Sequence, residues 1–119
     1  MPRNWTHDLD AQGRMELALT RLLKSQLRLF VFTKKFEAEP QREWGTLLKV
    51  EKDFLAGANR EWDEVLDLWE DPSHRTKLVY HLMDSAMREA REGVIEGLRG
   101  SVPDVDLIVQ SFRAGVRVE

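Results

Sequence analysis

The 119-residue sequence contains no cysteine, which excludes a disulfide scaffold, thiol catalysis and cysteine-ligated zinc. It also lacks any apolar run near the roughly 20 residues that a membrane span needs, so we expect no membrane segment. The first ten residues have no signal-peptide core. A cysteine-free chain is compatible with a reducing compartment, and we expect a cytoplasmic protein.

Proline and glycine are also scarce, with four and seven residues, so few breaks interrupt the chain. Pro40, Pro72 and Pro103 suit the first turn of a helix, where the missing N–H would be unpaired anyway. They divide the chain into four predicted helices, an N-terminal arm and a tail. The helices cover residues 9–38, 41–70, 73–99 and 103–112, the arm covers 1–8 and the tail covers 113–119. We expect residues 114–119 to be weakly ordered, although Val116 and Val118 alternate as in a short extended segment.

Hydrophobic residues make up 42% of the sequence and charged residues 33%, which is typical of a folded domain. Within residues 44–69 the apolar positions recur in alternating steps of three and four, the period of an amphipathic helix. We expect this stripe, which includes Trp69, to face the core, with Leu47 and Phe54 flanking it. Glu51 is the single charge inside that stripe and needs a partner. Short connections make successive helices antiparallel. The sequence therefore predicts one all-α domain, an antiparallel up-down bundle of three long helices plus a short C-terminal helix.

The first predicted helix carries a basic stripe with two apolar residues beside it. Its members are Arg14, Arg21, Lys24, Arg28 and Lys35, flanked by Leu17 and Phe32. One interpretation is a surface that binds the phosphates of DNA or RNA. The alternative is pairing within the chain. A hairpin turning near residue 39 places Arg14 opposite Glu64 and Asp67, Arg28 opposite Glu51, and Lys35 opposite Glu43.

The second predicted helix ends in an acidic cluster. The candidate partner-binding residues there are Asp63, Glu64, Asp67 and Glu70. One hypothesis is that they mimic phosphate and bind a basic partner protein, as an inhibitor would. The alternative is the solvated side of an amphipathic helix.

The third predicted helix has a seam of small residues, Ala86, Ala90, Gly93 and Gly97. Small side chains let a second helix approach closely. One hypothesis is therefore a homodimer that forms through this seam.

Arg75 and His81 form an Arg-x5-His pattern at the start of the third predicted helix. The pattern resembles the Arg-x(4–6)-His signature of HEPN ribonucleases, which are also small helical bundles. The resemblance implies RNA cleavage at a dimer cleft by this arginine and histidine. The family usually has Asn, Asp or His after the arginine, where this chain has Thr76. On a regular helix, six positions also separate the two side chains by about 120°.

Motifs for other chemistry are missing. The sequence has no Glu-x-x-His pair for a di-iron bundle, no P-loop, no dinucleotide-binding motif and no serine-hydrolase motif. We expect no metal and no cofactor. These absences favour a non-catalytic interaction protein or accessory subunit that docks onto a larger protein or ribonucleoprotein complex, with nucleic acid as one possible contact of the basic stripe.

Overall fold

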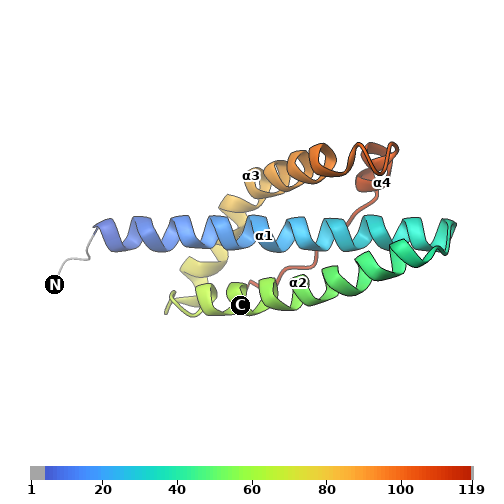
Figure 1. The fold of residues 1–119 in the computed structure, drawn as a ribbon. Coiled ribbons are helices and arrows are strands. Elements are labelled where there is room, and N and C mark those ends of the chain that lie inside the picture. Colours follow the sequence, from blue (N-terminus) through green and yellow to red (C-terminus); the bar gives the residue numbers. More distant parts are fainter. Residues whose placement is uncertain (1–4, 119) are drawn as a thin grey trace.

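The computed structural model of this protein describes residues 5–118, with side chains from residue 10 onward (Figure 1). It contains four helices among these residues and no strand. They are α1 (Trp5–Ala38), α2 (Arg42–Leu66), α3 (Pro72–Leu98) and α4 (Val105–Gln110). The predicted all-α bundle of three long helices and a short C-terminal helix is confirmed.

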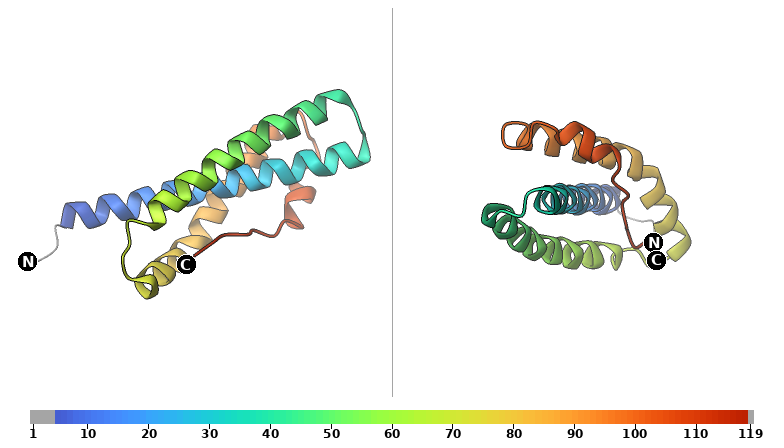
Figure 2. Two further views of the ribbon diagram at one scale, coloured as in Figure 1. Left: turned by 90° about the horizontal axis from the view of Figure 1, so that it is seen from below. Right: turned by 90° about the vertical axis from the view of Figure 1, so that its right-hand side faces the viewer.

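Helix α1 lies at the centre of the bundle because it is apolar on more than one side. Helix α2 returns antiparallel along one flank, and α3 crosses the other flank (Figures 1 and 2). Both pack chiefly against α1 rather than against each other. Met15, Leu19, Leu23 and Leu27 of α1 are fully buried, and each contributes about 1.5–3 kcal/mol of hydrophobic stabilisation. The result is an elongated molecule of 59 × 22 × 21 Å.

Helix α1 begins earlier than predicted. The arm placed at residues 1–8 is helical from Trp5 onward, and residues 1–4 lie outside the described part of the chain. The sequence holds no proline or glycine between Trp5 and the predicted start at residue 9.

Helix α2 ends at Leu66, four residues before the predicted end at residue 70. The N–H groups of Leu68 and Trp69 donate to the carbonyls of Val65 and Leu66, each at 3.1 Å. These bonds span three residues and tighten the chain into a turn. The turn carries the side chain of Trp69 into the core, where it is 6% exposed. Burial of Trp69 was predicted, but the turn places it there rather than the helix.

The last helix and the tail also differ from the prediction. Helix α4 covers only Val105–Gln110 of the predicted 103–112. The tail was predicted to be weakly ordered. In the structure it runs extended across the opening between α2 and α3, as both views in Figure 2 show. Val116 and Val118 pack against the core. No helix in residues 5–118 is both long and apolar enough to cross a membrane.

Candidate interaction site

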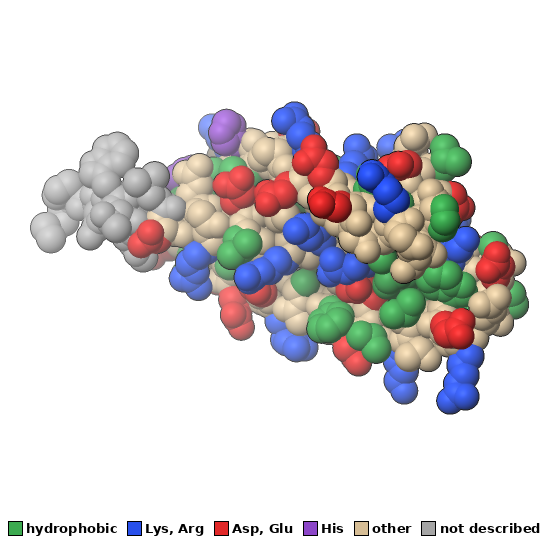
Figure 3. Space-filling view, turned by 45° about the horizontal axis from the view of Figure 1, so that its top comes forward, with side chains coloured by type: hydrophobic (Ala, Val, Ile, Leu, Met, Phe, Trp, Pro, Cys, Tyr) green, Lys and Arg blue, Asp and Glu red, His purple; other side chains and the backbone are tan. Residues whose placement is uncertain are grey.

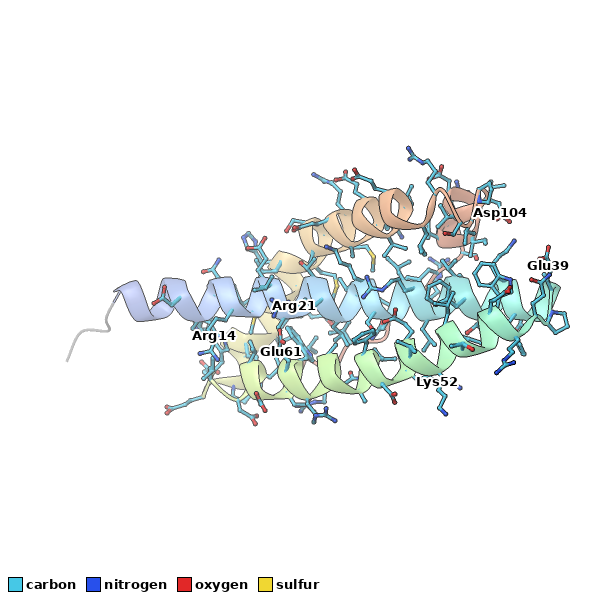
Figure 4. All side chains as sticks on the ribbon, in the orientation of Figure 1. Arg14, Arg21, Glu39, Lys52, Glu61 and Asp104 are labelled. Atoms are coloured by element: carbon cyan, nitrogen blue, oxygen red, sulfur yellow. The ribbon has the colours of Figure 1, made fainter. Side chains whose placement is uncertain are left out.

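Two of the predicted cations form ion pairs at the surface of the bundle. Nη1 of Arg21 lies 3.1 Å from Oε1 of Glu61, and Figure 4 shows these side chains meeting between α1 and α2. Nζ of Lys35 lies 3.7 Å from Oδ1 of Asp104, which stands just before α4. The Lys35 ammonium also lies 6.0 Å from the centre of the Trp44 ring. A phosphate would have to displace a carboxylate at each of these positions.

A third cation takes part in a buried network. Nε of Arg28 donates to Oε1 of Glu51 at 2.8 Å, and the Ser25 hydroxyl donates to Oε2 of Glu51 at 2.8 Å. The Glu51 side chain is 5% exposed and that of Arg28 is 34% exposed. The two hydrogen bonds satisfy both oxygens of the carboxylate, which removal from water would otherwise destabilise strongly. The predicted pairing of Arg28 with Glu51 is confirmed.

The remaining two cations, Arg14 and Lys24, form no ion pair with any carboxylate among residues 10–118. Arg14 is exposed near the C-terminal end of α2 (Figure 4). Lys24 is half-buried and leans toward α3. A Cβ built on Gly93 would lie 2.9 Å from its Cε atom. Only two of the five predicted stripe cations therefore remain without an acidic partner in this part of the chain.

The two apolar residues of the predicted stripe differ in exposure. Leu17 is 50% exposed, as a contact residue should be, whereas Phe32 is 5% exposed and packs in the core. Its ring centre lies 6.3 Å from that of Trp44 on α2. Phe32 is thus a core residue. Its side chain lies in the α1–α2 interface and is not accessible to a partner.

A hollow that the sequence did not reveal lies along the seam between α1 and α2. We call it the α1–α2 groove. It has a volume of about 520 Å³ and is lined by Arg21, Ser25, Arg28, Asp53, Phe54, Gly57, Ala58 and Glu61. The small residues Gly57 and Ala58 leave space there. A second hollow of about 260 Å³, which Arg14 and Leu17 help to line, continues the seam beyond the Arg21–Glu61 pair.

An apolar ridge borders the α1–α2 groove. Its members are Leu47, Val50 and Phe54, which are 40%, 44% and 62% exposed. Spacings of three, four and seven residues place all three on one side of α2. In Figure 3 apolar and basic side chains lie next to one another on this part of the surface. The spacing was readable in the sequence, but Leu47 and Phe54 were interpreted as flanks of the core stripe.

The acidic candidates are dispersed. Oδ1 of Asp63 lies 2.7 Å from Nη2 of Arg117 in the tail. Glu64 points to the solvent on α2, Asp67 caps the end of that helix, and Glu70 lies in the turn before α3. All four are exposed. They do not form one continuous helical face, because α2 ends before Glu70.

The small-residue seam of α3 serves packing within the chain over half of its length. Ala86 and Ala90 are fully buried in the core. They are not accessible to a second copy of the chain. Gly93 and Gly97 are exposed.

Arg75 and His81 of the Arg-x5-His pattern do not lie together within one copy of the chain. Helix α3 is regular from Pro72, so Arg75 and His81 keep their separation of about 120°. Nη1 of Arg75 donates to the carbonyls of Leu66 at 3.3 Å and Trp69 at 3.5 Å. Arg75 therefore satisfies carbonyls at the end of α2, which is a structural role.

No group of three or more His, Asp or Glu side chains within residues 10–118 is arranged to hold a metal ion. Comparison with protein families, with characterised proteins and with solved structures finds no match to this chain. The interpretation of function therefore depends on the surface itself.

Proposed function

We propose that this protein is a non-catalytic helical interaction module that docks onto a larger protein through the α1–α2 groove. The observation that carries the proposal is the apolar ridge of Leu47, Val50 and Phe54 beside the groove. Contiguous exposed apolar side chains mark interaction surfaces in small globular proteins. A cytoplasmic setting belongs to the same proposal, because a cysteine-free chain is compatible with a reducing compartment.

The chemistry of the groove favours a protein over a nucleic acid. Arg21 and Arg28 line it, but each already meets a carboxylate of α2. Both arginines line the groove together with Phe54. Aromatic and arginine side chains are enriched where protein partners bind, and apolar contact contributes most of the energy there. We infer that an apolar segment of the partner covers the ridge, with its polar groups over the two arginines.

Capture from a lysate of the source organism tests this proposal. The bait is the full-length tagged chain, compared with a ridge variant carrying Leu47→Ser and Phe54→Ser. A matched control carries Tyr80→Ser and Leu107→Ser, two apolar positions on α3 and α4 that are at least as exposed as those of the ridge. We expect one protein to co-purify with the wild type and the control but not with the ridge variant. The same difference must reappear when that protein is purified and mixed with each bait.

Two outcomes contradict the proposal. Equal capture by all three baits would show that the ridge is not the docking surface. A mobility shift of RNA or DNA that persists in the ridge variant and disappears on Arg14→Glu with Lys24→Glu would assign the surface to nucleic acid instead. Circular dichroism of each variant establishes that the helices remain folded.

A further inference from the structure

The C-terminal tail, residues 113–118, is held through its main chain on the side of the bundle where α2 and α3 diverge (Figure 2). The side-chain amide of Gln26 donates to the carbonyl of Gly115 at 2.7 Å and accepts from its N–H at 3.2 Å. The indole N–H of Trp62 donates to the carbonyl of Arg117 at 2.7 Å. A Cβ at Gly115 would meet nothing within 4 Å, so the site does not require glycine. These bonds recognise an extended backbone.

The side chains of the tail add a simple pattern. Val116 and Val118 are half-buried and pack against the core. Between them, Arg117 points to the edge and donates to Oδ1 of Asp63 from Nε at 3.1 Å and from Nη2 at 2.7 Å. The site therefore accepts an apolar residue, a basic residue and a second apolar residue in alternation, as an extended segment presents them.

The site continues beyond the residues that the tail fills. A hollow of about 300 Å³ opens next to Gln26, at the start of the tail. Its apolar lining includes Leu29, Phe30, Leu55 and Phe112, and Arg113 of the tail borders it. The two valines are also only half-buried, so the tail makes modest use of the surface beneath it. A longer extended segment has room here for at least one further apolar side chain.

We propose that this site is a peptide-binding groove that the tail occupies in its own chain and that an extended segment of a partner protein takes over. The partner segment carries apolar residues at alternate positions with a basic residue between them. Gln26 and Trp62 hydrogen-bond to its main chain, and Asp63 pairs with its basic residue. The tail competes for the groove within its own chain and has a high effective concentration there. A partner segment therefore binds only when its affinity and concentration are high enough to displace the tail. This groove lies on a different face from the α1–α2 groove.

A peptide added to the full-length chain tests the proposal. The probe is a fluorescent peptide with the sequence of residues 113–118, Arg-Ala-Gly-Val-Arg-Val, and its anisotropy reports binding. The tail is loosened by Val116→Ser with Val118→Ser in the full chain. We expect the loosened chain to bind the peptide with a dissociation constant at least tenfold lower than that of the wild type. If the serine variant fails to fold, Arg117→Glu loosens the tail at an exposed position instead.

A second pair of variants distinguishes specific recognition of the peptide main chain from non-specific binding. Gln26→Ala in the loosened chain should weaken peptide binding about tenfold, because it removes both bonds to the Gly115 main chain. Gln12→Ala, a half-buried glutamine elsewhere on α1, should leave binding unchanged. The proposal is overturned if a folded loosened chain does not bind the peptide, if the wild type binds it equally well, or if the two glutamine variants behave alike.

Discussion

At the scale of single residues, the buried carboxylate of Glu51 is the centre of a polar network in the α1–α2 interface. It accepts from Ser25 and Arg28, each at 2.8 Å. The surface pair of Arg21 with Glu61 resembles it in chemistry, but those side chains are 56% and 38% exposed. Burial therefore separates two ion pairs formed by the same two helices.

We predict that Glu51→Gln lowers the free energy of unfolding by about 1–2 kcal/mol. The variant exchanges two hydrogen bonds to a charged acceptor for weaker neutral ones in a buried position. Glu61→Gln is the matched control and should cost less than about 0.5 kcal/mol, because water screens an exposed pair. Urea unfolding followed by circular dichroism measures both. Equal effects at the two positions would contradict the structural role of Glu51.

Hairpin geometry predicted the partner of Arg28 correctly and that of Lys35 wrongly, because it placed Lys35 opposite Glu43. Antiparallel hairpin geometry was enough to place Arg28 opposite Glu51, since both lie on helices joined by a short turn. Lys35 pairs with Asp104, which is 69 positions further along the chain. No local rule relates these two residues, because their distance depends on how the whole of α3 crosses α1. The prediction that Phe32 is accessible to a partner was wrong for a related reason. Helix α1 is covered on more than one side, so its sequence alone does not show which of its faces reach the solvent.

At the scale of elements, two glycines within long helices differ in the space around them. Gly57 lies in the middle of α2, and a Cβ built there would meet only Nη2 of Arg60, at 3.8 Å. Gly93 lies in α3, where a Cβ would lie 2.9 Å from Cε of Lys24. Both glycines reduce helix stability relative to alanine, but only one of them has a neighbour that must move.

We predict that Gly57→Ala raises the free energy of unfolding by about 0.5–1 kcal/mol, the usual gain for removing glycine from a helix interior. Gly93→Ala should gain less, because the Lys24 side chain has to change its conformation. Urea unfolding of the two variants gives the comparison. A gain at Gly93 equal to that at Gly57 would mean that Lys24 does not lie against α3.

The ends of the elements were the least predictable part of the fold. The apolar periodicity predicted that the second helix ends at residue 70, because Trp69 continues the apolar stripe. The structure buries Trp69 through a turn that starts after Leu66. An apolar residue can thus keep its place in the core while its backbone leaves the helix. The tail is similar, because its order comes from Gln26 and Trp62, which no pattern within residues 113–118 reveals.

At the scale of the whole molecule, the central position of α1 makes the bundle long rather than round. A compact chain of this length has an expected radius of gyration of about 13.5 Å. The described residues have a radius of 16.1 Å. The excess follows from the length of α1 and α2, which lie side by side, while α1 separates α2 from α3.

Small-angle X-ray scattering should therefore give a radius of gyration of about 16–18 Å for a monomer, the upper part of the range allowing for hydration. The forward scattering at the same time reports the mass. A radius near 13.5 Å would contradict the extended arrangement of α1 and α2. A mass twice that of one chain would show self-association, and repeating the measurement on the Leu47→Ser, Phe54→Ser variant would show whether the ridge mediates it.

The charge of the molecule predicts how binding to duplex DNA would depend on salt concentration. The net charge is −3, and only Arg14 and Lys24 of the basic stripe lack an acidic partner among residues 10–118. Binding to duplex DNA through five cations would give a log–log salt slope of about −4.5, whereas two cations give about −2. We expect any binding to show a slope no steeper than about −2, measured by fluorescence anisotropy between 50 and 200 mM salt. A slope near −4.5 would mean that Arg21, Arg28 and Lys35 exchange their carboxylates for phosphate. It would also predict that Glu61→Gln strengthens binding, because that variant frees Arg21 without burying a new charge.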